Sequence, residues 1–193
     1  MTPGSLPFEY PFRWKDLAER FGVDEATISY LEQRDRDLED FLSKPPRVGS
    51  SFMRRSVNQS VPTAGSAAYP VGYTRVDFDT IEMDDLGGVD ASTDTFTATV
   101  AGAYLVTANI SWAPNVTGNR VLIVGLNAAV LVSTSSAALG GGYTTNQNAV
   151  TMVDLAVGDQ IVLDVLQNSG GALDLEASGV QPHLSASLLR ASE

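Results

Sequence analysis

The sequence contains no cysteine and only one histidine among its 193 residues. The absence of cysteine excludes disulfide bonds, thiol catalysis and every zinc site that needs a Cys ligand. A single histidine excludes His-rich metal sites and leaves His183 as the one imidazole base. No cofactor and no metal site are expected.

The sequence also lacks a long apolar run and an excess of positive charge. Its longest apolar stretches, 121–124 and 128–132, fall far short of the roughly 20 residues of a membrane-spanning helix. The first residues, MTPGSLPFEYPFRW, have neither the basic start nor the apolar run of a secretory signal, so we expect a soluble protein without membrane insertion. The net charge of −11 repels nucleic acid and anionic lipid, which argues against either as the main partner.

The charges divide the chain into two parts. Of the 23 Asp and Glu residues, 13 follow residue 60, but only three of the 12 Lys and Arg residues do so. The break falls within 43–73, a stretch rich in Pro, Gly and Ser, which is typical of a linker. We therefore expect an anchoring and oligomerisation segment at 1–44, a linker arm at 45–73 and a head domain at 74–193 that folds alone.

Residues 14–42 carry apolar side chains at helical spacing. The intervals fit a heptad seam made of Leu17, Phe21, Ile28, Leu31, Leu38 and Leu42. A short helix cannot bury such a stripe alone, so the seam predicts a coiled coil between subunits or a packed helical hairpin. Residues 16–36 also resemble a helix-turn-helix with Gly22 at the turn, but Asp24 and Glu25 would then face phosphates. One continuous helix and a bend used for packing both stay open.

Residues 74–190 alternate short β-prone runs with turn residues. The runs are rich in Val, Ile, Thr, Tyr and Leu, and they are separated by Gly, Asn, Asp and Pro. Strands are predicted near 74–82, 95–100, 103–113, 119–125, 129–134, 148–156, 160–167, 172–177 and 183–190. So many short strands without helices predict a mainly β fold, a sandwich or jelly roll.

Three pieces of this part occur in a distinctive order. They are Phe96-x5-Gly102-x-Tyr104-x-Val106, Leu155-x2-Gly158-Asp159-x-Ile161-x-Leu163 and Ser185-x-Ser187-Leu188-Leu189. In this order they resemble the globular head of the complement collagen-like proteins and the tumour necrosis factor superfamily. The resemblance covers 74–190 and implies a ten-strand jelly roll that trimerises through aromatic-rich faces. Two departures are Val106, where an aromatic residue is usual, and the lack of a preceding collagen repeat.

Other candidate sites have simpler structural interpretations. His183 lies near Ser185 and Ser187, but no oxyanion hole or orienting Asp is marked, so a structural His is expected. The acidic stretch 77–85 lacks the Gly and terminal Glu of an EF-hand loop, which favours a solvated loop over a calcium site. The basic pair 54–55 is suited to docking on an acidic partner.

These features together indicate a structural virion protein, a bacteriophage tail or head fibre or minor tail protein, made in the host cytoplasm. We expect no enzyme activity. The expected partners are further copies in a homotrimer, other virion proteins bound through residues 1–73, and a host cell-surface molecule. Two alternatives stay open: a secreted trimeric signalling or adhesion ligand with the same head, and a DNA-binding regulator that uses residues 16–36.

Overall fold

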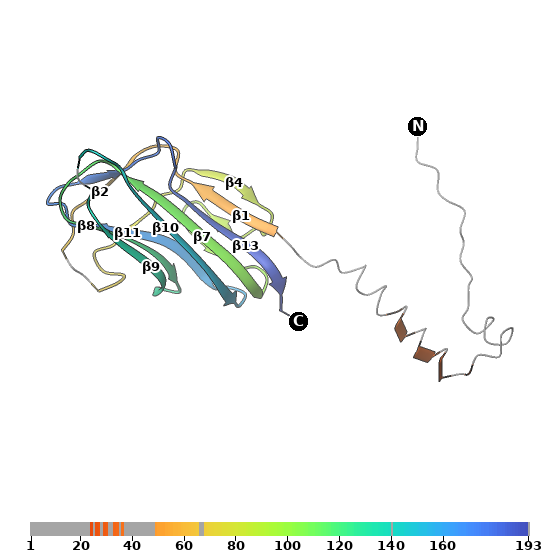
Figure 1. The fold of residues 1–193 in the computed structure, drawn as a ribbon. Helices are drawn as coiled ribbons and strands as arrows, with labels where there is room; N and C mark the ends of the chain where they lie inside the picture. Colours follow the sequence, from red (N-terminus) through yellow and green to blue (C-terminus); the bar gives the residue numbers. More distant parts are fainter. Residues whose placement is uncertain are drawn as a thin grey trace, which may run out of the picture. The chain divides into compact units, whose positions relative to one another are not determined.

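The computed structural model describes residues 49–65, 68–139 and 141–192, and residues 24, 26, 27, 29, 30, 33, 34 and 36 of the N-terminal part. The chain divides into two units, 1–45 and 46–193. The second unit is a β sandwich (Figure 1). Within the described part of the chain, no helix has the length and apolar character needed to cross a bilayer.

Asp24 marks the start of a helical turn in the first unit. Asp24 itself is not helical, and its carboxylate accepts hydrogen bonds from the backbone N and the Oγ1 of Thr27, at 2.9 and 2.8 Å. This is the arrangement of an N-cap, and the same bonds lower the pKa of Asp24. The alternative of one continuous helix over 14–42 is therefore wrong at this position. All six predicted seam residues lie outside the described residues, so the coiled coil stays a prediction.

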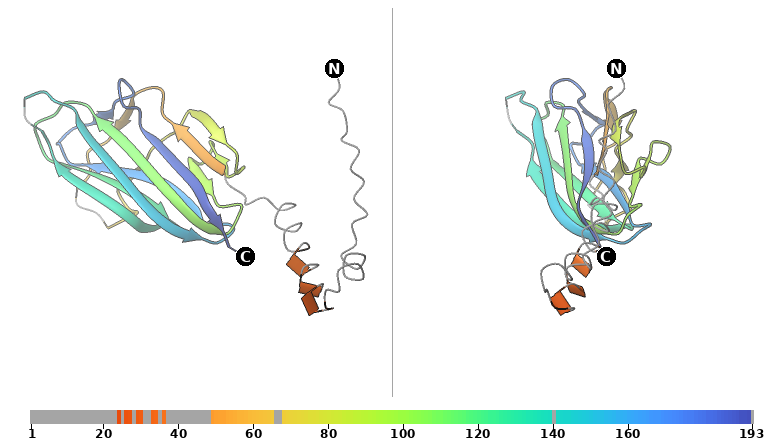
Figure 2. Two further views of the ribbon diagram at one scale, coloured as in Figure 1. Left: turned by 45° about the vertical axis from the view of Figure 1, so that its right-hand side comes forward. Right: turned by 90° about the vertical axis from the view of Figure 1, so that its right-hand side faces the viewer.

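Two antiparallel sheets stack face to face in the head (Figure 2). The first sheet contains β1 (Gly49–Arg54), β2 (Gln59–Val61), β4 (Thr80–Asp84), β7 (Gly102–Trp112), β10 (Thr145–Leu155), β12 (Leu173–Leu175) and β13 (His183–Ala191). The second sheet contains β3 (Thr74–Arg75), β5 (Val89–Asp90), β6 (Thr95–Thr97), β8 (Asn119–Leu126), β9 (Ala129–Ala137) and β11 (Gln160–Gln167). The prediction of a mainly β jelly-roll sandwich is confirmed.

Strand order explains which side chains share a face. The first sheet runs β10-β7-β13-β1-β4, and the β12–β2 pair continues beside the end of β7. The second sheet runs β5-β6-β11-β8-β9, and β3 also pairs with β11. Alternate residues of a strand point to opposite faces, so each sheet gives one side to the core and one to its outward face. The inward residues of β7, β8 and β11 form much of the core and are all buried: Tyr104, Val106, Ala108, Ile110, Leu122, Val124, Ile161, Leu163 and Val165.

The predicted linker arm at 45–73 is wrong for its middle part. β1 pairs with both β13 and β4, and β2 pairs with β12, so 49–61 lies within the first sheet. Met53 and Val61 are buried in the core. Serine-rich strands flanked by Pro look like a linker locally, because β1 and β2 pair with β13 and β12, which lie more than a hundred residues away in the sequence, and β1 pairs also with β4. The head therefore includes β1 and cannot begin at residue 74.

Tyr69 lies across the outward face of the second sheet. Its Oη donates a hydrogen bond to the Asp164 carboxylate at 2.7 Å, and Arg75 Nε donates to the same carboxylate at 2.6 Å. Asp164 and its β11 neighbours Val162 and Leu166 are buried although they alternate away from the core. The part of this outward face that lies over β11 is thus covered by the chain itself, whereas the outward residues Ser133 and Ser135 of β9 are exposed.

Candidate functional site

The outward face of the first sheet is built from aligned rows of side chains. The first row, across β10, β7, β13, β1 and β4, is Val150, Thr107, Ser185, Phe52 and Met83. The second row, across β10, β7, β13 and β1, is Met152, Leu105, Ser187 and Ser50. None of these nine residues is charged, whereas the flanking rows of the same outward face carry Asp154 and Arg190 on one side and Arg54 on the other. We call the surface of these nine residues the first-sheet face.

The polar groups of the first-sheet face bond to each other. The hydroxyls of Thr107 and Ser185 lie 2.7 Å apart, and those of Ser50 and Ser187 lie 2.8 Å apart. A hydroxyl that already has a partner loses less when water is removed from it. The face can therefore be covered by another protein surface without leaving these groups unpaired.

Three of the five apolar side chains of the first-sheet face are open to solvent, and Phe52 and Leu105 are half-buried. Met152 is 73% exposed and Val150 is 63% exposed, although both lie in the middle of a long strand. Met83 of β4 is also exposed. Apolar residues gathered on one sheet face and left uncovered are typical of a protein–protein contact. The sequence held a signal for this face, since Val150 and Met152 sit at alternate positions of β10, but strand pairing was needed to assemble the rows.

The head-domain signature residues have structural roles. Phe96, Tyr104 and Leu188 are core residues, and Tyr104 also donates its Oη hydrogen bond to the Val100 carbonyl at 2.7 Å. Gly102 has no room for a side chain, because an added Cβ would lie 2.2 Å from the Arg190 carbonyl oxygen. Leu189 lies outside the core and is half exposed.

Gly158 and Asp159 make the turn between β10 and β11. Gly158 has a φ of +92°, in the left-handed region that favours glycine. The Asp159 carboxylate accepts hydrogen bonds from the side chain of Asn127 and from the backbone N of Ala156, both at 2.8 Å. These bonds lower the pKa of Asp159. Gly158 and Asp159 thus form a tight turn in which the Asp side chain caps the adjacent backbone.

His183 and the two nearby serines do not converge. The His183 ring lies 5.3 Å from the Phe52 ring, and its Nδ1 is 3.1 Å from the Gln181 carbonyl oxygen. The hydroxyls of Ser185 and Ser187 each bond to another hydroxyl across the sheet rather than to the imidazole. These residues act as parts of the first sheet and its outward face.

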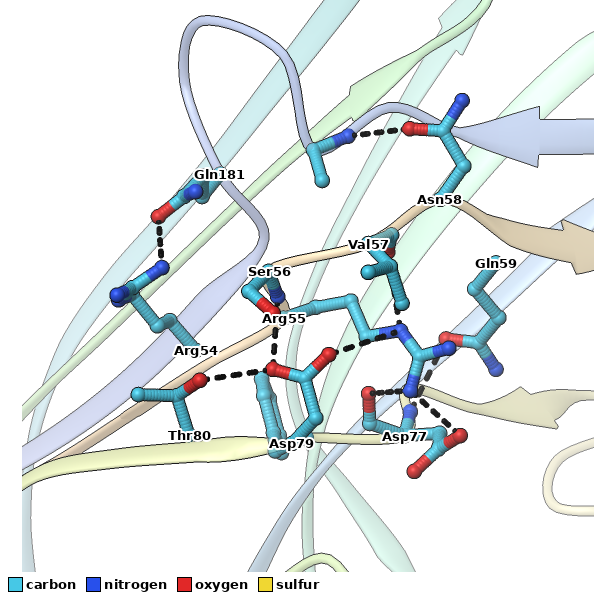
Figure 3. A network of polar contacts seen from close by, with 12 residues as sticks. Arg54, Arg55, Ser56, Val57, Asn58, Gln59, Asp77, Asp79, Thr80 and Gln181 are labelled. Carbon is cyan, nitrogen blue, oxygen red and sulfur yellow. Dashed lines mark hydrogen bonds and ion pairs between the residues drawn. The ribbon is translucent and has the colours of Figure 1, made fainter.

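The basic pair 54–55 is neutralised within the chain, and Figure 3 shows the contacts of Arg55 with Asp77 and Asp79. Arg55 donates to Asp77 at 2.7 Å and lies 3.8 Å from Asp79, and Arg54 pairs with Glu82. The interpretation of a free docking site for an acidic partner is therefore wrong, because the acidic groups come from the segment that includes β4. Burial works to raise the pKa of Asp79, but hydrogen bonds from Ser56 and Thr80 and the charge of Arg55 lower it overall. The described residues contain no cluster of three ligands that could hold a metal ion.

Three loops at one end of the head form an uncharged tip. The tip loops are 113–118, 138–144 (residue 140 lies outside the described residues) and 168–172, and their sequences contain no Asp, Glu, Lys or Arg. Backbone hydrogen bonds tie all three to each other or to the adjoining strand ends. Val116 and Tyr143 are 68% and 70% exposed. A chain with a net charge of −11 thus carries a tip with no formal charge.

The two-sheet antiparallel jelly roll is the fold of head domains of the complement and tumour necrosis factor type. The sequence matches the C1q domain family over residues 60–180, well over half of the chain. The protein therefore belongs to the C1q domain family, and the resemblance predicted from the three sequence pieces is confirmed. Comparison with curated protein sequences finds no match.

Three solved structures with the same fold are animal proteins. Eiger TNF from S. frugiperda is 11% identical with a TM-score of 0.57, covering 77% of this chain and 96% of that one. Murine APRIL is 13% identical with a TM-score of 0.53, covering 74% and 100%. The globular domain of the zebrafish complement 1qA protein is 16% identical with a TM-score of 0.53, covering 75% and 99%. Identities this low show a shared fold alone.

Proposed function

We propose that this protein is a non-enzymatic structural component of a bacteriophage particle, a tail or head fibre or minor tail protein. Its C1q head forms a homotrimer that decorates the particle or binds the host surface. The observation that carries the proposal is the first-sheet face, whose two rows contain no charged residue and expose Val150, Met152 and Met83. We take three subunits because the head family that the sequence resembles is trimeric. In a closed trimer with rotational symmetry, every subunit uses the same face for its contacts.

Covering the first-sheet face is energetically favourable. Fully burying a Val or Met side chain contributes about 1.5–3 kcal/mol, and Val150 and Met152 both have most of that surface to lose. The paired hydroxyls lower the desolvation cost, and the two rows hold no charge that would repel the same face of another subunit. Self-association therefore succeeds in spite of the net charge of −11.

The test is the mass in solution of the full chain and of two variants. The unchanged protein should have three times the chain mass by light scattering. Met152→Asp places one carboxylate per subunit in the buried face and should shift the population to monomer. Val116→Asp is the matched control, because Val116 is about as exposed but lies in a tip loop; it should leave the trimer intact. A stable folded monomer of the unchanged protein, or a trimer indifferent to Met152→Asp, would contradict the proposal.

The virion role draws its support from composition. The chain has no cysteine, and its acidic charge is concentrated in the head, which suits a protein folded and assembled in bacterial cytoplasm. Residues 1–48 are the part proposed to bind other virion proteins, since 49–61 is committed to the first sheet. The uncharged tip loops are the part proposed to meet the host surface.

Two measurements examine the virion role. Antibodies to the head should decorate purified particles, and electron microscopy should place the label on the tail or the capsid. Binding of heads to host cells should change little with added salt, because an uncharged tip has no long-range attraction to screen. Particles that lack the protein, or a steep loss of binding with salt, would contradict this assignment.

A further inference from the structure

Arg120 is a cation enclosed in the sandwich. It lies near the start of β8 on the same side as Leu122 and Val124, so it points between the two sheets. The residue has no exposed surface at all, and burial lowers the pKa of its guanidinium. A buried charge is costly unless a group of opposite charge or a full set of hydrogen bonds compensates it.

The partners of Arg120 compensate it incompletely. Its Nη1 donates to the carbonyl oxygens of Thr117 and Asn119, both at 3.1 Å, while Nε and Nη2 have no partner. The Trp112 ring covers the guanidinium at 5.8 Å, which gives a cation–π contact but no acceptor for the two free donors. In the described part of the chain, the arginines that form ion pairs are Arg54, Arg55 and Arg75, and no carboxylate pairs with Arg120.

A second buried polar atom without a partner lies directly across the sheet. Ser136 of β9 is the cross-strand neighbour of Arg120, and its Oγ is buried with no hydrogen bond. Directly opposed residues bring their Cβ atoms to within about 5.5 Å of each other. The nearby Gln147 is already engaged, because its amide oxygen accepts from Trp112 and its amide nitrogen donates to the Arg120 and Thr134 carbonyls.

We propose that Arg120 and Ser136 form a binding site for a small monovalent anion such as chloride, held between β8 and β9 at the tip end of the sandwich. The unpartnered groups are two N–H donors of a cation and one hydroxyl that can donate. One anion would accept from all three and neutralise the guanidinium, whereas a water molecule would leave the charge uncompensated. The ion would then tie the β8–β9 hairpin to the loop 113–118, whose Thr117 carbonyl holds the other side of Arg120.

The experiment is a thermal unfolding titration of the full chain in which chloride replaces gluconate at constant ionic strength. A ligand that binds only the folded state raises the midpoint in a saturating manner. The rise should be about 2–4 °C once chloride exceeds its dissociation constant about fourfold. Ser136→Ala and Arg120→Met should each remove the chloride-dependent part of the rise. Arg54→Met is the matched control, because Arg54 already pairs with Glu82, and it should keep the chloride dependence.

Crystals soaked in bromide give an independent measurement that needs no variant. Anomalous scattering should place a bromide ion within hydrogen-bond distance of Arg120 Nε or Nη2 and of Ser136 Oγ. This measurement tests the anion site even if Arg120→Met fails to fold. Identical midpoints in chloride and gluconate, a chloride effect that survives both substitutions, or a water molecule in place of bromide would each overturn the proposal.

Discussion

A single methyl group added at Gly125 of β8 should disturb the part of the second sheet that Tyr69 covers. A Cβ added at Gly125 would lie 2.2 Å from the Tyr69 Oη and 2.9 Å from Val162 Cγ2. The Oη cannot stay in place at that distance, so Gly125→Ala forces Tyr69 away from the Asp164 carboxylate. The backbone of Gly125 lies outside the left-handed region, so alanine is otherwise acceptable there.

The cost of Gly125→Ala can be worked from the contacts it breaks. The hydrogen bond from Tyr69 to Asp164 has a charged acceptor, and losing such a bond costs about 1.5–3 kcal/mol. Forcing an extra methyl group into a packed site adds about 1–3 kcal/mol. The substitution should therefore lower the free energy of unfolding by about 3–5 kcal/mol. Each kcal/mol corresponds to about 2–4 °C in the melting temperature of a chain this long.

Urea unfolding of a double-mutant cycle measures the coupling between the two residues. Tyr69→Phe removes the Oη, so Gly125→Ala should cost at least about 1 kcal/mol less in that background than alone. Gly171→Ala is the control, because nothing lies within 4 Å of an added Cβ there. It should be neutral or stabilising by about 0.4–1 kcal/mol, since alanine restricts the unfolded chain. Equal costs of Gly125→Ala with and without the Oη would refute the steric reasoning.

Two further predictions concern the start of the head and its behaviour in alkali. A chain that begins at Thr74 should be unfolded by circular dichroism, whereas one that begins at Pro46 should fold, because burial of Met53 and of Val61 contributes about 1.5–3 kcal/mol each; a cooperative melt of the shorter chain would contradict this. Burial and the neighbouring Asp164 raise the pKa of Tyr69. Its contribution to stability should be complete below pH about 10, the value of a free tyrosine, and decline above it; Tyr69→Phe should flatten this decline in urea midpoints measured across that range.

The sequence was sufficient for the local elements of the head. Alternation along 103–113 reflects one face that is buried in the core, and β7 forms there within a residue or two of the predicted bounds. β11 forms at the predicted 160–167, although both of its faces are buried. The three family pieces could also be recognised in the sequence. Gly102 leaves room for a close backbone contact, Gly158 adopts a positive φ, and the Asp159 side chain bonds to the backbone N of Ala156. A close backbone approach or a positive φ strongly restricts which residue can occupy a position, so such positions can be recognised from the sequence.

Tertiary structure decided what depends on distant partners. The sequence predicts a linker where β1 and β2 form, since these serine-rich strands are stabilised by pairing with β13 and β12 rather than by their own propensity. The sequence predicts that Arg54 and Arg55 are free, but the fold places Glu82 beside Arg54, and Asp77 and Asp79 beside Arg55. The first-sheet face and the Arg120–Ser136 pair likewise exist only through register, because pairing across strands fixes which side chains meet. Sequence determined which residues alternate, and packing determined which of them became neighbours.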